Sequence, residues 1–91
     1  HVVPLFLNTY LKPLLEYGKG KNRDLFNTLR VYLQTNGNIK EAANILYIHR
    51  SSLKYRLERI REIIGMDIDQ AEQRFNLMLA YKLYDLFGED F

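Results

Sequence analysis

The stretch that decides the fold is NIKEAANILYIHRSSLKYRLERIREIIG, residues 38–65. It predicts two helices joined by a tight turn. Asn38 followed by Glu41 predicts a capping box at the start of the first helix, in which each side chain accepts a hydrogen bond from a backbone N–H group. Gly65 suits a left-handed stop after the second helix. The second helix is indicated by apolar residues at steps of four, three and four, namely Leu53, Leu57, Ile60 and Ile64.

Two adjacent alanines indicate that these helices pack closely. Where the first helix of a helix-turn-helix crosses the second, a bulky side chain would push them apart, and Ala42 and Ala43 are small. Apolar residues follow Ala43 after five, ten and fourteen positions, namely Ile48, Leu53 and Leu57. This spacing resembles the Fis-type variant of the helix-turn-helix, although Tyr47 stands where the turn usually has glycine. The spacing favours this motif over an ordinary helical hairpin.

The composition suits one small domain with a single core, since 47% of the 91 residues are hydrophobic. The absence of cysteine excludes disulfides and thiolate metal sites, and we expect neither a metal nor a cofactor. No apolar run reaches the roughly 18 residues that span a bilayer, and no signal peptide is visible. We therefore expect a cytoplasmic protein with no membrane partner. Because the chain begins with His1 rather than Met, we expect a fragment or an expressed domain of a longer protein.

The net charge of +2 conceals an uneven distribution. Residues 1–64 contain eleven Lys and Arg against five Asp and Glu, a balance of +6, whereas residues 65–91 contain two against six, a balance of −4. A basic body with an acidic tail suits a polyanion bound on one side. The alternative is that these charges are only solvated surface residues.

The N-terminal stretch is apolar but contains Pro13, which argues against one unbroken helix. We expect a short helix over about Leu5–Tyr10, a break, and a turn of helix at Leu14–Tyr17. Gly18–Asn22, with the sequence GKGKN, is expected to be a flexible basic loop.

A helix before the central pair is expected to begin with Asp24 as its cap. Its inward stripe consists of Leu25, Leu29, Tyr32 and Leu33. Gly37 then serves as the helix stop and Asn38 as the cap of the next helix. Three helices therefore share one core, which is the smallest arrangement that makes a helix-turn-helix a stable unit.

A last helix is expected after Gly65, with Asp69 as its cap and Glu72 three residues later. Its stripe is expected at Phe75, Leu79, Leu83 and Leu86. Further apolar residues widen this surface, so the helix should also pack on the N-terminal segment, which we favour, or on a partner subunit. The expected fold is an all-α bundle: a helix-turn-helix domain with a C-terminal apolar helix at residues 23–91, preceded by a helical segment and loop at residues 1–22.

The helix at about residues 50–64 is expected to be a recognition helix that enters the major groove of DNA by its N-terminal half. With Leu53 pointing inward, helical geometry turns the neighbouring polar residues outward. Glu58 and Glu62, farther along, would repel DNA. We expect base or groove contacts from His49, Arg50, Ser51, Ser52, Lys54 and Tyr55. We expect phosphate contacts from Asn38, Lys40, Arg56 and Arg59.

Several of these residues have a structural alternative. His49 could cap the helix instead of contacting DNA. Arg59 and Arg61 could pair with nearby glutamates at helical spacing, which stabilises a helix by about a few tenths of a kcal/mol. Tyr55 could be a packing residue of the surface.

At these residues the chain resembles the C-terminal DNA-binding domain of the PucR/CdaR family of bacterial transcription regulators. The resemblance covers about Asp24 to Leu83 and is carried by NGNIKEAANILYIHRSSLKYRLERIREIIGMDI and DQAEQRFNLMLAYKL. Its most specific part is the pattern H-R-x-x-L-x-Y-R-L, which begins at His49. Ser51 and Ser52 stand where the family often has Asn-Thr, a change that keeps small polar side chains and allows a different base preference.

The resemblance implies a DNA-binding domain at the C-terminus of a transcription regulator, usually an activator of a catabolic operon. It also implies an upstream sensory domain, missing from this chain, and a homodimer or higher oligomer that binds repeated half-sites on double-stranded DNA.

The other functional classes are less well supported. An enzyme is not expected, because the chain has two histidines, no cysteine and no Gly-rich phosphate loop, and we assign no catalytic residue. The main alternative is a helical protein–protein interaction or dimerisation module that uses the apolar last helix. RNA binding is a weaker alternative, because no platform of paired aromatic residues is evident.

Overall fold

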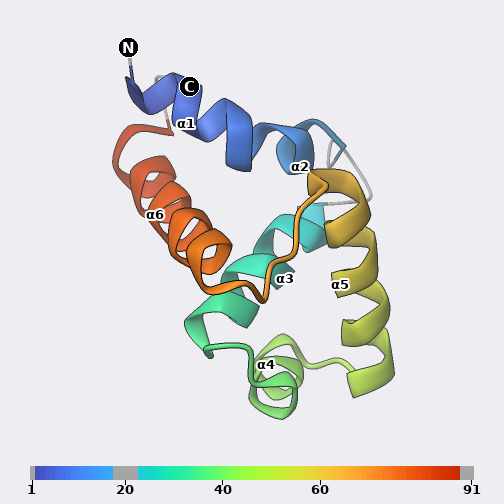
Figure 1. The fold of residues 1–91 in the computed structure, drawn as a ribbon. Helices are drawn as coiled ribbons and strands as arrows, with labels where there is room; N and C mark the ends of the chain where they lie inside the picture. The colour runs from blue at the N-terminus through green and yellow to red at the C-terminus, as the bar shows by residue number, and fades with distance from the viewer. Residues whose placement is uncertain (1, 18–22, 89–91) are drawn as a thin grey trace.

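The computed structural model describes residues 2–17 and 23–88, and this part of the chain consists of helices joined by turns (Figure 1). The described helices are α1 (Val2–Tyr10), α2 (Lys12–Tyr17), α3 (Arg23–Gln34), α4 (Ile39–Leu46), α5 (Arg50–Ile64) and α6 (Ala71–Phe87). None of the described residues lies in a strand, so the predicted all-α class is confirmed. No described helix is both long enough and apolar enough to cross a membrane. The loop predicted at Gly18–Asn22 lies outside the described residues.

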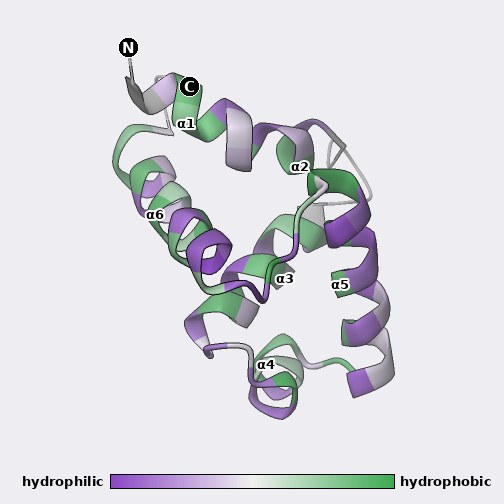
Figure 2. Ribbon diagram, in the orientation of Figure 1, coloured by the Kyte–Doolittle hydropathy of each residue, from purple (hydrophilic) through white to green (hydrophobic). Residues whose placement is uncertain are grey.

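α3 lies at the centre of the fold and contacts α2, α4, α5 and α6 (Figure 1). Its predicted stripe is buried and consists of Leu25, Leu29, Tyr32 and Leu33. The stripe of α5 is buried too and consists of Leu53, Leu57, Ile60 and Ile64. Figure 2 shows the matching pattern, with hydrophilic residues along the outer side of α5. The predicted core shared by α3, α4 and α5 is therefore confirmed.

The pair α4–α5 packs as closely as the alanines predicted. Ala42 and Ala43 are both buried, and α4 contacts α3 as well as α5. Asn38 caps α4, because its Oδ1 accepts a hydrogen bond from the Glu41 N–H at 3.0 Å. The reciprocal half of the predicted capping box does not form. The Asn38 N–H donates instead to the carbonyl of Thr35 at 3.2 Å.

Tyr47 closes α4 in the left-handed conformation, with φ 57°, and thus replaces the usual turn glycine. A non-glycine residue in this region stores about 1 kcal/mol of strain. Its side chain is 94% exposed, so the turn places no steric demand on it. The turn is held by the Ile48 N–H, which donates to the carbonyl of Ala43 at 3.1 Å. Gly65, with φ 69°, ends α5 as predicted. After α3 the first residue in the left-handed conformation is Asn36, with φ 56°, and Gly37, with φ 80°, follows it, so the predicted stop at Gly37 is shared with Asn36.

The N-terminal helices differ from their predicted bounds. α1 begins at Val2 rather than Leu5, and α2 begins at Lys12 rather than Leu14, so the predicted break is reduced to Leu11. Pro13 lies in the first turn of α2, where a missing N–H is tolerated because the amides of a first turn have no partner within the helix. α1 packs along α6, and α2 packs on α3 and α5. The last helix therefore receives the N-terminal segment, which is the arrangement that the sequence favoured.

Two predicted helix caps are wrong. Asp24 is not the cap of α3, because the helix already includes Arg23 and Asp24 lies in its first turn. Asp69 is not the cap of α6, because the cap position is Gln70, whose side chain makes no capping hydrogen bond. Asp69 instead binds side chains of α3 and α5, and these tertiary contacts take the carboxylate away from the helix end.

The predicted inward stripe of α6 is wrong for three of its four residues. Leu83 is half-buried, but the exposed members are Phe75, Leu79 and Leu86. The residues that α6 buries are Leu77, Ala80 and Tyr81. The buried face meets α1 and α3, and the Tyr81 hydroxyl donates to the carbonyl of Phe26 at 2.6 Å. Because α6 is apolar on more than one face, its periodicity could not select the face that packs.

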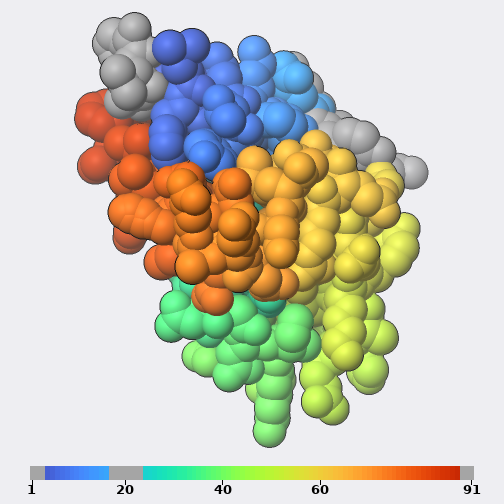
Figure 3. Space-filling view, in the orientation of Figure 1, coloured from blue at the N-terminus to red at the C-terminus, as the bar shows by residue number. Residues whose placement is uncertain are grey.

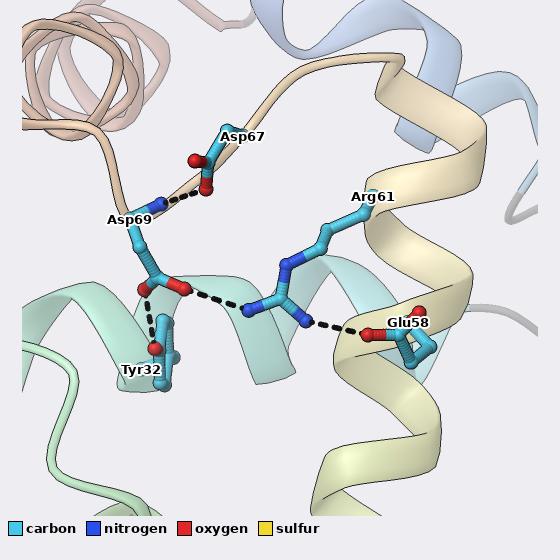
Figure 4. A network of polar contacts seen from close by, with 5 residues as sticks. All are labelled: Tyr32, Glu58, Arg61, Asp67 and Asp69. Carbon is cyan, nitrogen blue, oxygen red and sulfur yellow. Dashed lines mark hydrogen bonds and ion pairs between the residues drawn. The ribbon is translucent and has the colours of Figure 1, made fainter.

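Asp69 joins α3 to α5 through a network of polar contacts (Figure 4). The Tyr32 hydroxyl donates to Oδ1 of Asp69 at 2.6 Å, and Nη2 of Arg61 donates to Oδ2 at 2.8 Å. Nη1 of Arg61 reaches Glu58 at 3.2 Å. Burial, followed by the hydrogen bond to Asp69, raises the pKa of Tyr32 from 10.0 to about 12. The same hydrogen bond lowers the pKa of Asp69.

We expect Tyr32 to make the fold sensitive to alkaline pH. Because its pKa is raised in the folded state, its contribution to the free energy of unfolding is complete below pH 10.0 and is lost as pH rises toward about 12. The measurement is the urea midpoint against pH for the wild type and Tyr32→Phe. At neutral pH the free energy of unfolding of the variant should be about 1 kcal/mol lower than that of the wild type, as is typical for one hydrogen bond. As pH rises above 10.0, the free energy of unfolding of the variant should then fall less than that of the wild type.

Tyr81 also contributes to the loss of stability at alkaline pH, so the effect of Tyr32 appears only as the difference between the wild type and Tyr32→Phe. Burial raises its pKa as well, and this effect is present in both the wild type and Tyr32→Phe. An equal alkaline decline in the two proteins would contradict the assignment to Tyr32.

Candidate nucleic-acid interface

His49 caps the N-terminus of α5, as its structural alternative predicted. Its backbone is extended, and its Nδ1 accepts a hydrogen bond from the Ser51 N–H at 3.1 Å and lies 2.8 Å from the Ser51 hydroxyl. Because a backbone amide can only donate, Nδ1 is the unprotonated nitrogen and Nε2 carries the hydrogen. His49 therefore orients the first turn of α5, and the exposed ring still offers one N–H donor.

The N-terminal half of α5 presents polar side chains to solvent, as its helical spacing predicted. Tyr55 is 69% exposed, whereas the neighbouring Leu53 is fully buried. The exposed residues of these two turns are Arg50, Ser51, Ser52, Lys54 and Tyr55. Within residues 2–17 and 23–88, neither Arg50 nor Lys54 forms an ion pair. Two cations that form no ion pair among the described residues and three hydroxyl groups therefore gather at one end of the helix.

The C-terminal half of α5 has a different electrostatic character. Its exposed carboxylates are paired within the helix, since Arg61 binds Glu58 at 3.2 Å and Arg59 binds Glu62 at 2.9 Å. These pairs are the alternative that the sequence left open for both arginines. Arg59 is half-buried and engaged with a carboxylate, so it is less suited to a phosphate contact than its position in the sequence suggested.

The start of α4 lies at the same end of the molecule as the start of α5 (Figure 1). Asn38 and Lys40 are both exposed there. Side chains of this region project from the lower edge of the molecule in Figure 3, away from α1 and α2. The structure therefore brings these two predicted phosphate contacts to the end of the molecule that carries the exposed residues of α5.

A groove of about 630 Å³ lies between the start of α3 and the outer side of α5. Its lining consists of Asp24, Leu25, Ser51, Ser52, Tyr55, Arg56 and Arg59. Arg56 is half-buried, and its Nη1 donates to the hydroxyl of Thr28 in α3 at 3.1 Å. Reasoning from the sequence missed both Thr28 and the groove. The helical period of α3 places Thr28 beside its inward stripe, but no local pattern links it to an arginine of another helix.

The comparison with protein families agrees with this geometry. Residues 25–83 match the family described as PucR C-terminal helix-turn-helix domain. The chain belongs to this family. The resemblance inferred from the pattern that begins at His49 is thereby confirmed. The matched part includes all of α4 and α5 and most of α3 and α6.

Three relatives illustrate the family. The chain is 37% identical over 83 residues to the purine catabolism regulatory protein of Bacillus subtilis (strain 168), which covers 91% of this chain and 15% of that protein. It is 32% identical over 77 residues to the carbohydrate diacid regulator of Escherichia coli (strain K12), and the aligned region covers 84% of this chain and 20% of that protein. It is 38% identical over 60 residues to the proline-responsive transcriptional activator PutR of Bacillus subtilis (strain 168), and the aligned region covers 66% of this chain and 15% of that protein. No solved structure matches the chain significantly.

All three relatives are named as regulatory proteins, one of them as a transcriptional activator, and none is named as an enzyme, which agrees with the functional class expected from the sequence. The chain spans only 15% to 20% of the length of these three proteins. Within the described part of the chain, no group of three or more His, Asp or Glu residues is placed to hold a metal ion.

We expect the cap at His49 to contribute to stability separately from any DNA contact. His49→Ala removes the acceptor for the Ser51 N–H and should lower the free energy of unfolding by about 1 kcal/mol. His49→Asn keeps a capping acceptor and should retain most of the wild-type stability. Urea unfolding of the three proteins measures the difference. Equal losses in both variants would show that the ring contributes by packing and not by capping.

Proposed function

We propose that the chain binds double-stranded DNA sequence-specifically, with the N-terminal half of α5 in the major groove. The observation that carries the proposal is the division of charge along α5. Its start exposes Arg50 and Lys54 without an ion pair among the described residues, whereas Glu58 and Glu62 farther along are paired with arginines of the same helix. A polyanion is attracted to the first half, and the carboxylates disfavour it along the second.

The exposed side chains at the start of α5 suit the edges of bases. Arg50 can form a bidentate pair with O6 and N7 of guanine, which discriminates against other bases by about 1–3 kcal/mol, and Lys54 can donate to the same atoms. Ser51 and Ser52 can bind bases or phosphates through their hydroxyl groups. Tyr55 can offer its hydroxyl to a phosphate or its ring to the methyl group of thymine.

The proposed phosphate contacts flank these residues. Lys40 and Asn38 lie at the start of α4, and Asn38 uses only its Oδ1 for the cap, so its amide N–H groups can donate to a phosphate. Arg56 and Arg59 lie along the side of α5. His49 can add its Nε2–H from the turn.

The family membership supports a wider proposal about the whole protein. One matched relative is named for purine catabolism, one for carbohydrate diacids and one for a response to proline. By analogy, we propose that this chain belongs to a cytoplasmic activator of a catabolic operon. An upstream sensory domain and a homodimer or higher oligomer on repeated half-sites belong to the same proposal.

The proposed DNA contact is tested by removing both unpaired cations, Arg50→Ala with Lys54→Ala. A duplex site selected from random sequences and a random duplex are titrated with the 91-residue chain over a salt series. The wild type should bind with an affinity that falls as salt rises and should prefer the selected site. The double variant should reduce that preference about tenfold or more, since each base contact discriminates by about 1–3 kcal/mol.

A matched control reverses one cation at the other end of the fold, Lys12→Glu, which lowers the net charge by two, as the double variant does. It should leave the preference for the selected site unchanged. Failure of the wild type to bind any duplex at low salt would reject DNA binding by this chain. Equal effects of the double variant and Lys12→Glu would reject the role of α5 in reading sequence.

A second candidate function is contact with another copy of the chain through the exposed side of α6. Phe75 is 57% and Leu86 is 73% exposed. A hollow of about 590 Å³ lies on this side and is lined mainly by apolar groups, among them Phe75, Met78 and Leu79. The described helices leave this side uncovered, and a DNA-binding domain on repeated half-sites needs a partner copy. We therefore propose α6 as a self-association surface.

Leu79→Asp tests this surface, because it places a charge in the hollow without touching the buried side of α6. We expect it to weaken self-association at least tenfold in sedimentation equilibrium and to leave the circular dichroism spectrum unchanged. Ile45→Asp, at an exposed apolar position of α4, is the control and should associate like the wild type. A wild-type chain that stays monomeric at all concentrations would contradict the proposal.

A further inference from the structure

Thr28 is a fully buried polar residue in α3, and it contacts α5 through its hydroxyl. The hydroxyl donates to the carbonyl of Asp24 at 2.6 Å, and this bond uses its only hydrogen. The same oxygen lies 3.1 Å from Nη1 of Arg56. Because a guanidinium can only donate, Thr28 is the acceptor. The two bonds together fix the direction from which Arg56 must approach.

Arg56 is therefore held in place before any ligand binds. Arg50 and Lys54 form no ion pair in the described part of the chain, so ordering them on DNA reduces the rotamer freedom of long side chains. Arg56 is half-buried and has part of this freedom removed already. Its partner Thr28 is also neutral, and within the described part of the chain the guanidinium of Arg56 forms no ion pair, in contrast to the pairing of Arg59 with Glu62.

The groove between α3 and α5 gives this charge a place to act. Asp24 and Leu25 form its α3 wall, and the α5 wall consists of Ser51, Ser52, Tyr55, Arg56 and Arg59. The carboxylate of Asp24 repels anions, so a phosphate fits beside the α5 wall, where hydroxyl groups and guanidinium groups are concentrated. Thr28 takes only one donor of Arg56, and the remaining donors form a planar fork that matches two phosphate oxygens.

We infer that Thr28 is a positioning residue that directs Arg56 into this groove, where the guanidinium contacts a phosphate of the DNA backbone beside the recognition helix. The inference rests on the proposed DNA binding and adds to it a buried residue of α3. The competing explanation is that the hydrogen bond only ties α3 to α5. In that case, its loss lowers stability and leaves the phosphate contact intact.

The test compares the salt dependence of DNA binding for the wild type, Arg56→Ala, Thr28→Val and Thr28→Ser. Loss of one phosphate contact lowers the slope of log affinity against log salt by about 0.9. Arg56→Ala and Thr28→Val should both show this change. The ratio of wild-type affinity to variant affinity should therefore be about threefold smaller at about 200 mM salt than at about 50 mM salt. Thr28→Ser keeps the hydroxyl and should keep the wild-type slope. The slope for Thr28→Val combined with Arg56→Ala should be the same as the slope for Arg56→Ala alone, because both changes remove the same phosphate contact.

The possible failures are distinguishable. A wild-type slope for Thr28→Val, together with a lower melting temperature, would overturn the positioning role and leave a tie between helices. A wild-type slope for Arg56→Ala would overturn the phosphate contact. In both cases the wild type still binds DNA, and the proposed function stands. If the wild type binds no duplex, the proposed function and this inference fall together.

NMR relaxation of the arginine side-chain Nε–H groups gives a second test, which holds even if Thr28→Val fails to fold. In the free wild type, Arg56 should be rigid and Arg50 mobile, and addition of duplex DNA should shift the Arg56 signal. Equal mobility of Arg56 and Arg50 in the free chain would overturn the inference.

Discussion

The packing of α5 on α3 is the constraint on which the rest of the structure depends. The residues at its centre are fully or almost fully buried, and they are Leu29, Leu33, Leu53 and Leu57. Because one side of α5 is held in this core along the length of the helix, the opposite side must face solvent. α4 approaches the same core through Ala42 and Ala43 and completes the helix-turn-helix. The exposed side of α5 is thus a direct consequence of burial on the other side.

The charges on that exposed side divide the helix into two functional parts. At the start, His49 satisfies a free backbone N–H, and Arg50 and Lys54 form no ion pair among the described residues. Farther along, glutamates and arginines neutralise one another at helical spacing. Paired charges attract a polyanion weakly, whereas unpaired cations attract it strongly. This difference explains why one end of a uniformly polar surface is the better candidate for DNA.

Contacts between helices also decide what individual polar residues do. The Asp69 carboxylate has the sequence context of a helix cap, yet it accepts hydrogen bonds from Tyr32 and Arg61. The hydroxyl of Thr28 reaches Arg56 in α5. For Asp69, tertiary hydrogen bonds take the place of the predicted cap. Thr28 keeps its local hydrogen bond to the carbonyl of Asp24 and adds a tertiary one, because a buried hydroxyl can both donate and accept and its second partner can come from any helix that packs nearby.

The sequence by itself determined the family, the all-α class, the helix-turn-helix and the inward stripes of α3 and α5. It also determined the stops near Gly37 and at Gly65 and the outward direction of residues 50–52, 54 and 55. These features depend on periodicity, capping and backbone conformation, which act over a few residues. Only the tertiary structure decided the packed face of α6, the role of Asp69 and the partner of Arg56. α6 is apolar on more than one face, and the hydrogen bonds of Asp69 to Tyr32 and of Arg56 to Thr28 join residues 37 and 28 positions apart, so no local pattern could specify them.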